Sequence, residues 1–161
     1  MYEFLTWLEG SALGEAMRGM GVWSYGVFNL GHILGISTLF GSILALDLRL
    51  LGLWRQIPFR LIATPAVPLA AVGFSVAALS GICMIATNAT DYAGNPFLYI
   101  KFPAIALGLG NAAALHFLPA WRTSKSGEPS PRERRQLAVA GGASLASWLA
   151  AISAGRMIGY W

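Results

Sequence analysis

Hydrophobic residues dominate this chain in four long stretches that contain no charged side chain. The stretches are Gly19–Leu46, Leu61–Thr90, Phe102–Trp121 and Gln136–Gly155. A run of about 18 apolar residues is long enough to cross the hydrocarbon core of a bilayer as an α-helix. The pattern therefore predicts an all-α fold, a bundle of four transmembrane helices at about residues 22–46, 64–88, 97–121 and 133–158.

The N-terminal segment shows a different pattern, in which apolar residues recur at helical spacing. Glu3, Glu9 and Glu15 lie between these apolar positions. This spacing predicts an amphipathic helix over about residues 3–18 that lies at the membrane interface. Because the helix is acidic, we expect it to pack on the mouth of the bundle. Four spans and one such helix account for the whole chain as a single integral membrane domain, 1–161.

Prolines and polar residues mark where the second and fourth spans begin. Pro65 and Pro68 fit the first turns of the second span, where a missing backbone N–H costs little. The charged segment 122–135 predicts a soluble loop before the fourth span. Within it, Ser130 is followed by a proline and then by Glu133, which is the pattern of a helix start with a capping box.

Basic residues are concentrated in two of the connections. Charged residues make up only 11% of the chain, against roughly 25% in soluble domains, so each one informs the topology. The first and third connections hold eight of the eleven Lys and Arg residues: Arg49, Arg55, Arg60, Arg122, Lys125, Arg132, Arg134 and Arg135. The positive-inside rule predicts that these connections are cytoplasmic and that both termini lie outside, in the periplasm of a bacterial inner membrane. Their expected partner is anionic lipid rather than nucleic acid.

The only two histidines, His32 and His116, lie inside apolar stretches. An ionisable side chain within a span is costly, which makes these residues the first candidates for function. Small residues share their helix faces, Gly35 beside His32 and Ala112 beside His116. Such neighbours leave clearance for a flat macrocycle, and histidine is a common axial ligand of haem iron. The alternative is a histidine that hydrogen-bonds another helix or a lipid-interface group.

The depth of the two histidines bears on whether they share one haem. The first and third helices run in the same direction, with His32 before the midpoint of its stretch and His116 after it. Their offset is roughly ten residues, or about 15 Å along the membrane normal. A shared haem is therefore strained, and the alternative is two separate roles. The chain has no CxxCH motif, so any haem would be held non-covalently.

Other residues near the outer boundary add two alternatives. Lys101 and Arg156 are cations that suit haem propionates, a quinone head group or lipid phosphate, or that anchor the helices by snorkelling. A Cu(I) site is a further alternative, because thiol and thioether groups favour this ion. Its ligands would be His32, Cys83, Met84 and Met157.

The remaining polar and small residues favour structural roles. We expect Asp47 to pair with a loop arginine, and the spans carry no acid at mid-depth of the kind that proton-coupled transporters use. Gly31 and Gly35 form a small-xxx-small pair that suits close helix packing or an oligomer interface. Asn111 is predicted to bridge two helices through its amide. No hydrolase or phosphate-loop motif assigns an enzyme activity.

Six short segments carry a resemblance that extends over nearly the whole chain. The order WLE, HILG, DLRLLG, NPFLYIK, NAAALH and GRMIG resembles a group of uncharacterised bacterial four-helix membrane proteins. That group is distantly similar to copper-resistance protein D-like proteins and to two-haem transmembrane cytochromes b. The resemblance implies b-type haem ligation by histidines, and here assigns it only to His32 and His116. Two histidines allow at most one bis-histidine haem.

The sequence therefore leads to one main hypothesis and two alternatives. The main hypothesis is a small b-type haem protein that transfers electrons, with His32 and His116 as iron ligands and Lys101 and Arg156 as further cofactor contacts. The first alternative is a non-enzymatic scaffold or accessory subunit, as a homo-oligomer or within a larger membrane complex. Copper handling is the third reading.

Overall fold

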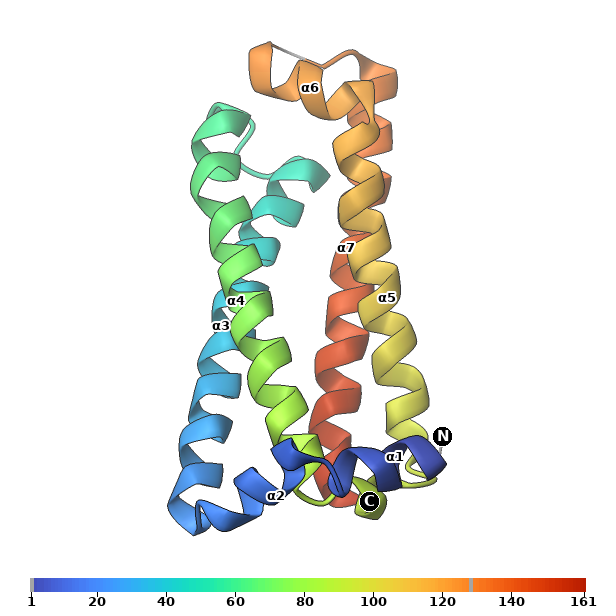
Figure 1. Ribbon diagram of the computed structural model, residues 1–161. Coiled ribbons are helices and arrows are strands. Elements are labelled where there is room, and N and C mark those ends of the chain that lie inside the picture. The colour runs from blue at the N-terminus through green and yellow to red at the C-terminus, as the bar shows by residue number, and fades with distance from the viewer. Residues whose placement is uncertain (1, 128) are drawn as a thin grey trace. The chain divides into compact units, whose positions relative to one another are not determined.

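The computed structural model describes residues 2–127 and 129–161. It contains the helices α1 (Tyr2–Glu9), α2 (Ala12–Gly19), α3 (Val22–Leu51), α4 (Phe59–Thr87), η1 (Ala89–Tyr92), α5 (Pro96–Phe117), α6 (Pro119–Ser126), α7 (Pro131–Met157) and η2 (Ile158–Tyr160). The described residues include no strand. Four long helices among them, α3, α4, α5 and α7, are apolar and long enough to cross a membrane (Figure 1). The predicted all-α class with four candidate transmembrane helices is confirmed.

The chain divides into two compact units. Unit 1 consists of Met1–Leu39 and Ala71–Pro96, and unit 2 consists of Phe40–Ala70 and Phe97–Trp161. Unit 1 therefore holds α1, α2, η1, the first part of α3 and the last part of α4. Unit 2 holds the remainder of α3 and α4 together with α6, α7, η2 and nearly all of α5.

Glycines bring α3 and α4 into backbone contact within unit 1. A Cβ atom added at Gly35 would lie 2.7 Å from the backbone nitrogen of Ala77. One added at Gly73 would lie 2.5 Å from the backbone nitrogen of Leu39. Of the predicted small-residue pair, Gly35 makes this contact, whereas a Cβ at Gly31 would meet nothing within 4 Å. The two helices thus approach each other through Gly35 and Gly73, as small residues in membrane helices permit.

The predicted single helix over residues 3–18 is wrong, because two helices occupy this segment. The helix is interrupted at Gly10 and Ser11, which separate α1 from α2. Ser11 takes an extended conformation, and its side chain accepts a hydrogen bond from the backbone N–H of Gly14, 3.3 Å away. A capping serine of this kind starts a new helix. The segment is still amphipathic, since Leu5 and Met17 are buried.

Glu9 and Arg18 attach α1 and α2 to the end of α4 and to η1 within unit 1. The backbone N–H and the hydroxyl of Thr90 both donate to Glu9 Oε2, each over 2.7 Å. Arg18 donates to the backbone oxygens of Thr87, at 3.1 Å, and Glu9, at 2.9 Å. The pKa of the Glu9 carboxyl is lowered from 4.5, first by the Thr90 N–H and then by the Thr90 hydroxyl.

We predict that α1 undocks from η1 in acid. Because the pKa of Glu9 is lowered on docking, the stabilisation is complete above the ordinary pKa and is lost as the pH falls through the docked value. Between these two pKa values the docking equilibrium falls by up to about tenfold per pH unit. Hydrogen-exchange protection of the Thr90 amide measures this docking. In Glu9→Gln the acid transition should disappear, and a transition that persists in this variant would contradict the assignment.

Unit 2 is built around a core where α3, α4, α5, α6 and α7 contribute apolar side chains. Its buried residues are Leu50, Phe59, Ala63, Leu115, Ala120, Trp121, Leu137 and Ala140. The ring of Trp148 on α7 lies over Gly108 on α5, where an added Cβ would approach Trp148 to 2.9 Å. The amide of Asn111 donates to the backbone oxygen of Ala140, 3.0 Å away, so the predicted helix bridge is confirmed.

Three helix boundaries in unit 2 differ from the prediction. The helix expected to end near residue 46 continues to Leu51, before Gly52 at a φ of +109°. The next helix begins at Phe59, so Pro65 and Pro68 lie inside α4 rather than in its first turns. The helix expected to reach residue 121 ends at Phe117 because α6 begins at a proline, Pro119.

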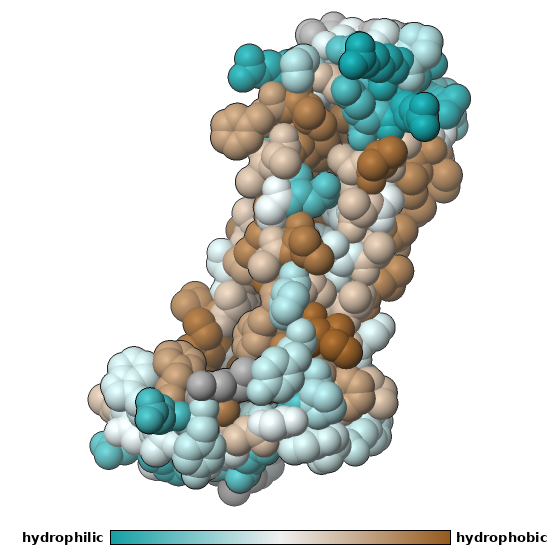
Figure 2. All heavy atoms as spheres, turned by 90° about the vertical axis from the view of Figure 1, so that its right-hand side faces the viewer, coloured by the Kyte–Doolittle hydropathy of each residue, from teal (hydrophilic) through white to brown (hydrophobic). Residues whose placement is uncertain are grey.

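The connection predicted as a soluble loop contains α6, which lies across the direction of α5 and α7 (Figure 1). The predicted start of the fourth span is confirmed. Ser130 caps α7, Pro131 is its first residue, and Glu133 completes a capping box. Figure 2 shows hydrophilic residues gathered at this end of unit 2 and apolar residues along the adjoining helices. This change in polarity is what a membrane boundary requires.

Candidate functional site

His32 is held against α4 within unit 1. The side chain is half-buried, and its Nδ1 atom lies 2.8 Å from the backbone oxygen of Ala77 and 3.2 Å from Ser80 Oγ. The imidazole also packs on Gly81, where an added Cβ would come within 3.0 Å of its Cε1 atom. These contacts fix the position of the ring. They also explain a glycine at position 81, since a larger residue would displace the histidine.

The hydrogen-bond partners determine which nitrogen of His32 carries the proton in the neutral ring. The Ala77 carbonyl oxygen can only accept. The Ser80 hydroxyl donates to the backbone oxygen of Val76 at 2.6 Å, so its oxygen is an acceptor toward His32. Nδ1 must therefore be the donor, and the lone pair lies on Nε2. A carbonyl oxygen on the second ring nitrogen is the usual arrangement of a histidine that binds a metal through Nε2.

His116 shows the same arrangement at the end of α5 in unit 2. Its Nδ1 atom lies 2.7 Å from the backbone oxygen of Ala112, which again places the proton on Nδ1 and the lone pair on Nε2. Its ring lies 5.0 Å from the Trp121 ring, measured between centroids. The side chain is exposed on the surface of the unit, whereas that of His32 is half-buried.

The small residues beside the two histidines do not have the role that the sequence predicted. Gly35 was expected to leave clearance for a macrocycle. That interpretation is wrong, because α4 covers this position at backbone distance. Ala112 instead provides the carbonyl that orients His116.

Lys101 and Arg156, predicted as cofactor contacts, both lie in unit 2. The Lys101 side chain is half-buried against α7, and its Nζ atom lies 3.6 Å from the position that a Cβ of Gly155 would take. The guanidinium of Arg156 donates to the Tyr160 hydroxyl and lies 4.8 Å from the centroid of the Tyr160 ring. Arg156 on α7 is thus held by an aromatic side chain of η2, which follows directly.

The predicted ligands are divided between the two units. His32, Cys83 and Met84 belong to unit 1, whereas His116, Lys101, Arg156 and Met157 belong to unit 2. Within the part of the chain that the structure describes, no group of three or more His, Cys, Asp or Glu side chains is arranged to hold a metal ion.

Asp47 is a buried acid whose environment the sequence did not reveal. It is only 2% exposed, and the Ser144 hydroxyl donates a hydrogen bond to its carboxyl group. Its Oδ2 atom accepts no hydrogen bond from the described residues. The predicted ion pair with a loop arginine is wrong, because Asp47 faces α7 at Gly141 and Ser144. Arg49 instead donates to the backbone oxygens of Ile57 and Arg55.

Comparison with known proteins identifies one family. Residues 4–161 match the model of a family described as "Family of unknown function (DUF6644)". No curated protein and no solved structure matches the chain.

Proposed function

We propose that this chain, which belongs to the DUF6644 family, is a multi-pass membrane protein that binds b-type haem and transfers electrons. One observation carries the proposal. Both histidines direct Nδ1 at a backbone oxygen, which is the orientation of a histidine that binds a metal through Nε2. Haem, when bound, supplies one-electron redox chemistry. The resemblance noted in the sequence supports the same function, because the four-helix proteins that this chain resembles are distantly similar to copper-resistance protein D-like proteins and to transmembrane cytochromes b.

The residues of the chain would bind and orient the cofactor. The Ala77 oxygen, the Ser80 oxygen and the glycine at position 81 hold the His32 ring in one orientation. A carbonyl on Nδ1 also increases the basicity of Nε2 and so strengthens a bond to iron. Lys101 and Arg156 are the cations proposed to contact propionates. We place the arginine-rich connections in the cytoplasm and both termini in the periplasm of an inner membrane, following the positive-inside rule.

An absorption spectrum of the protein purified in detergent tests the proposal. We expect a Soret band with sharp α and β bands after reduction by dithionite. His32→Ala and His116→Ala should each abolish the six-coordinate spectrum if both residues bind one iron, whereas loss in only one variant would assign that residue alone. Protein supplied with haem that shows no Soret band, or spectra unchanged in both variants, would refute haem ligation by these residues.

A second candidate is a scaffold or accessory subunit, and one surface of α7 favours it. Ala143, Ala146 and Ser153 are exposed on this helix at spacings of three and seven residues. Small residues on a membrane helix allow another helix to approach closely. Cross-linking through cysteines introduced at Ala146 in native membranes tests this candidate. Homodimer or heteromer adducts support it, and a cross-linked pattern identical to that of an introduced cysteine at Leu107, an exposed site on α5, counts against it.

A further inference from the structure

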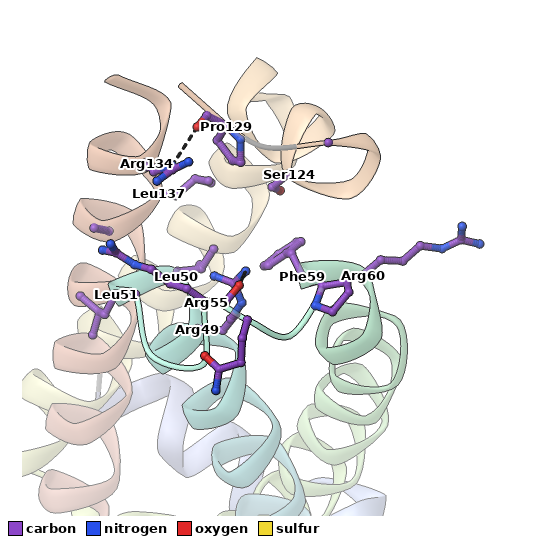
Figure 3. Close-up of a pocket in the computed structure, with 15 residues that line it drawn as sticks. Arg49, Leu50, Leu51, Arg55, Phe59, Arg60, Ser124, Pro129, Arg134 and Leu137 are labelled. Carbon is purple, nitrogen blue, oxygen red and sulfur yellow. Dashed lines mark hydrogen bonds between the residues drawn. The ribbon is translucent and has the colours of Figure 1, made fainter. Parts of the chain in front are cut away.

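A pocket lined by arginines lies at one end of unit 2. It has a volume of about 470 Å³ and is formed by the end of α3, the connection to α4, the α6 segment and the start of α7. Its lining includes Arg49, Arg55, Arg60 and Arg134, and the apolar side chains of Leu50, Leu51, Phe59 and Leu137 (Figure 3). The pocket therefore combines a cationic surface with an apolar one.

The backbone of the connection after α3 places two of these arginines. Gly52 and Trp54 have φ angles of +109° and +50°, so the chain turns sharply between the helices. Arg49 donates to the oxygens of Ile57, at 3.2 Å, and Arg55, at 3.4 Å, and so closes this turn. The guanidinium of Arg55 lies over Gly52, where a Cβ would come within 2.6 Å of its Nη2 atom. The position of both arginines is thus built into the fold.

Arg49 lies close to two other guanidinium groups of the pocket. Arg55 and Arg134 both exert like-charge repulsion on Arg49. Arg134 is oriented by a 2.9 Å hydrogen bond from its Nε atom to the backbone oxygen of Pro129. Figure 3 shows Arg60 extending away from the other three. Like charges held together in this way are stabilised by a bound anion.

We propose that Arg49 and Arg55 bind a phosphate group at the membrane surface. The planar guanidinium group matches phosphate oxygens with two parallel hydrogen bonds, and two such groups can hold one phosphate between them. The apolar side chains beside the arginines fit the acyl chains of an anionic phospholipid, and basic pockets at the ends of membrane helices bind such head groups. A free phosphate anion has the same chemistry and is the second source.

Native mass spectrometry of the full chain in a neutral detergent tests this proposal. The probes are phosphatidylglycerol, phosphatidylcholine as the zwitterionic control, and inorganic phosphate. We expect a retained phosphatidylglycerol adduct on the wild type. Arg55→Gln should weaken its binding by about 10- to 100-fold through the loss of one charge-assisted contact. Arg49→Gln should do the same, but it also opens the turn, so Arg55→Gln is the decisive variant.

Arg60→Gln is the matched control, since it removes the same charge at the same end of unit 2 from a side chain that points away. It should retain wild-type binding. Adducts of inorganic phosphate alone that depend on Arg55 would identify a free anion as the ligand and still support the site. If Arg55→Gln and Arg60→Gln weaken phosphatidylglycerol binding equally, the binding depends only on net charge, and the proposal is overturned. Equal retention of phosphatidylcholine, or no adduct with either phosphate source, would also overturn it.

Discussion

Replacing Gly35 with alanine is expected to lower the free energy of unfolding by about 1–3 kcal/mol. Alanine is the better helix former, so helix propensity alone predicts the opposite sign. The cost arises because the new methyl group would lie 2.7 Å from the backbone nitrogen of Ala77 and 2.9 Å from the backbone oxygen of Gly73. Backbone atoms of a neighbouring helix cannot move aside as a flexible side chain does, so α3 and α4 must separate. Thermal unfolding in detergent, followed by circular dichroism, measures the change.

Gly31→Ala is the matched control, one turn earlier on the same helix. A Cβ at this position would meet nothing within 4 Å, so the substitution should be neutral or stabilise the protein by up to about 1 kcal/mol. Gly73→Ala should resemble Gly35→Ala, because it meets the backbone of Leu39 at 2.5 Å. If Gly31→Ala and Gly35→Ala change stability equally, the close contact between the helices does not contribute to folding.

The four long helices were predictable because their information is local. Each needs only a run of apolar residues, and the start of α7 needs only Ser130, Pro131 and Glu133 within four positions. The predicted helix boundaries were wrong where a single backbone feature determines the end or the start of a helix. Gly52 sets the end of α3, and Pro119 starts α6 although the apolar run continues to Trp121. Hydropathy reports which residues avoid water, and it is insensitive to such interruptions.

The environments of the polar residues were less predictable because their partners are distant in sequence. The sequence identified His32 as a candidate, but the Ala77 oxygen that fixes its tautomer lies 45 residues away. Asp47 was expected to pair with a loop arginine such as Arg49. A carboxyl and a guanidinium two positions apart on a helix point in different directions, so Asp47 faces α7 and Arg49 faces the turn. A sequence shows which residues share one face of a helix, but it does not show which other helix packs against that face.

Removing the Ser144 hydroxyl is expected to destabilise the protein through Asp47. The carboxyl group is buried and already has one oxygen without a hydrogen bond, so Ser144→Ala would leave the second oxygen unsatisfied as well. An unsatisfied buried polar atom costs about 1–3 kcal/mol, and we expect a loss of that size in the free energy of unfolding. Ser147→Ala is the control, because that hydroxyl donates to the backbone oxygen of Ala143 within its own helix. It should change stability little.

Asp47→Val separates the role of the carboxyl from that of the serine. Replacing both partners of a buried hydrogen bond with apolar groups can be nearly neutral, so Asp47→Val combined with Ser144→Ala should unfold little more easily than the wild type. In the Asp47→Val background, Ser144→Ala should then have almost no effect, because no carboxyl remains to lose a donor. A double-mutant cycle measured by chemical unfolding in detergent gives the coupling between the two side chains. Additive effects would show that Ser144 stabilises α7 independently of Asp47, and a strong loss in Asp47→Val would show that the acid itself is required for the packing of α3 on α7.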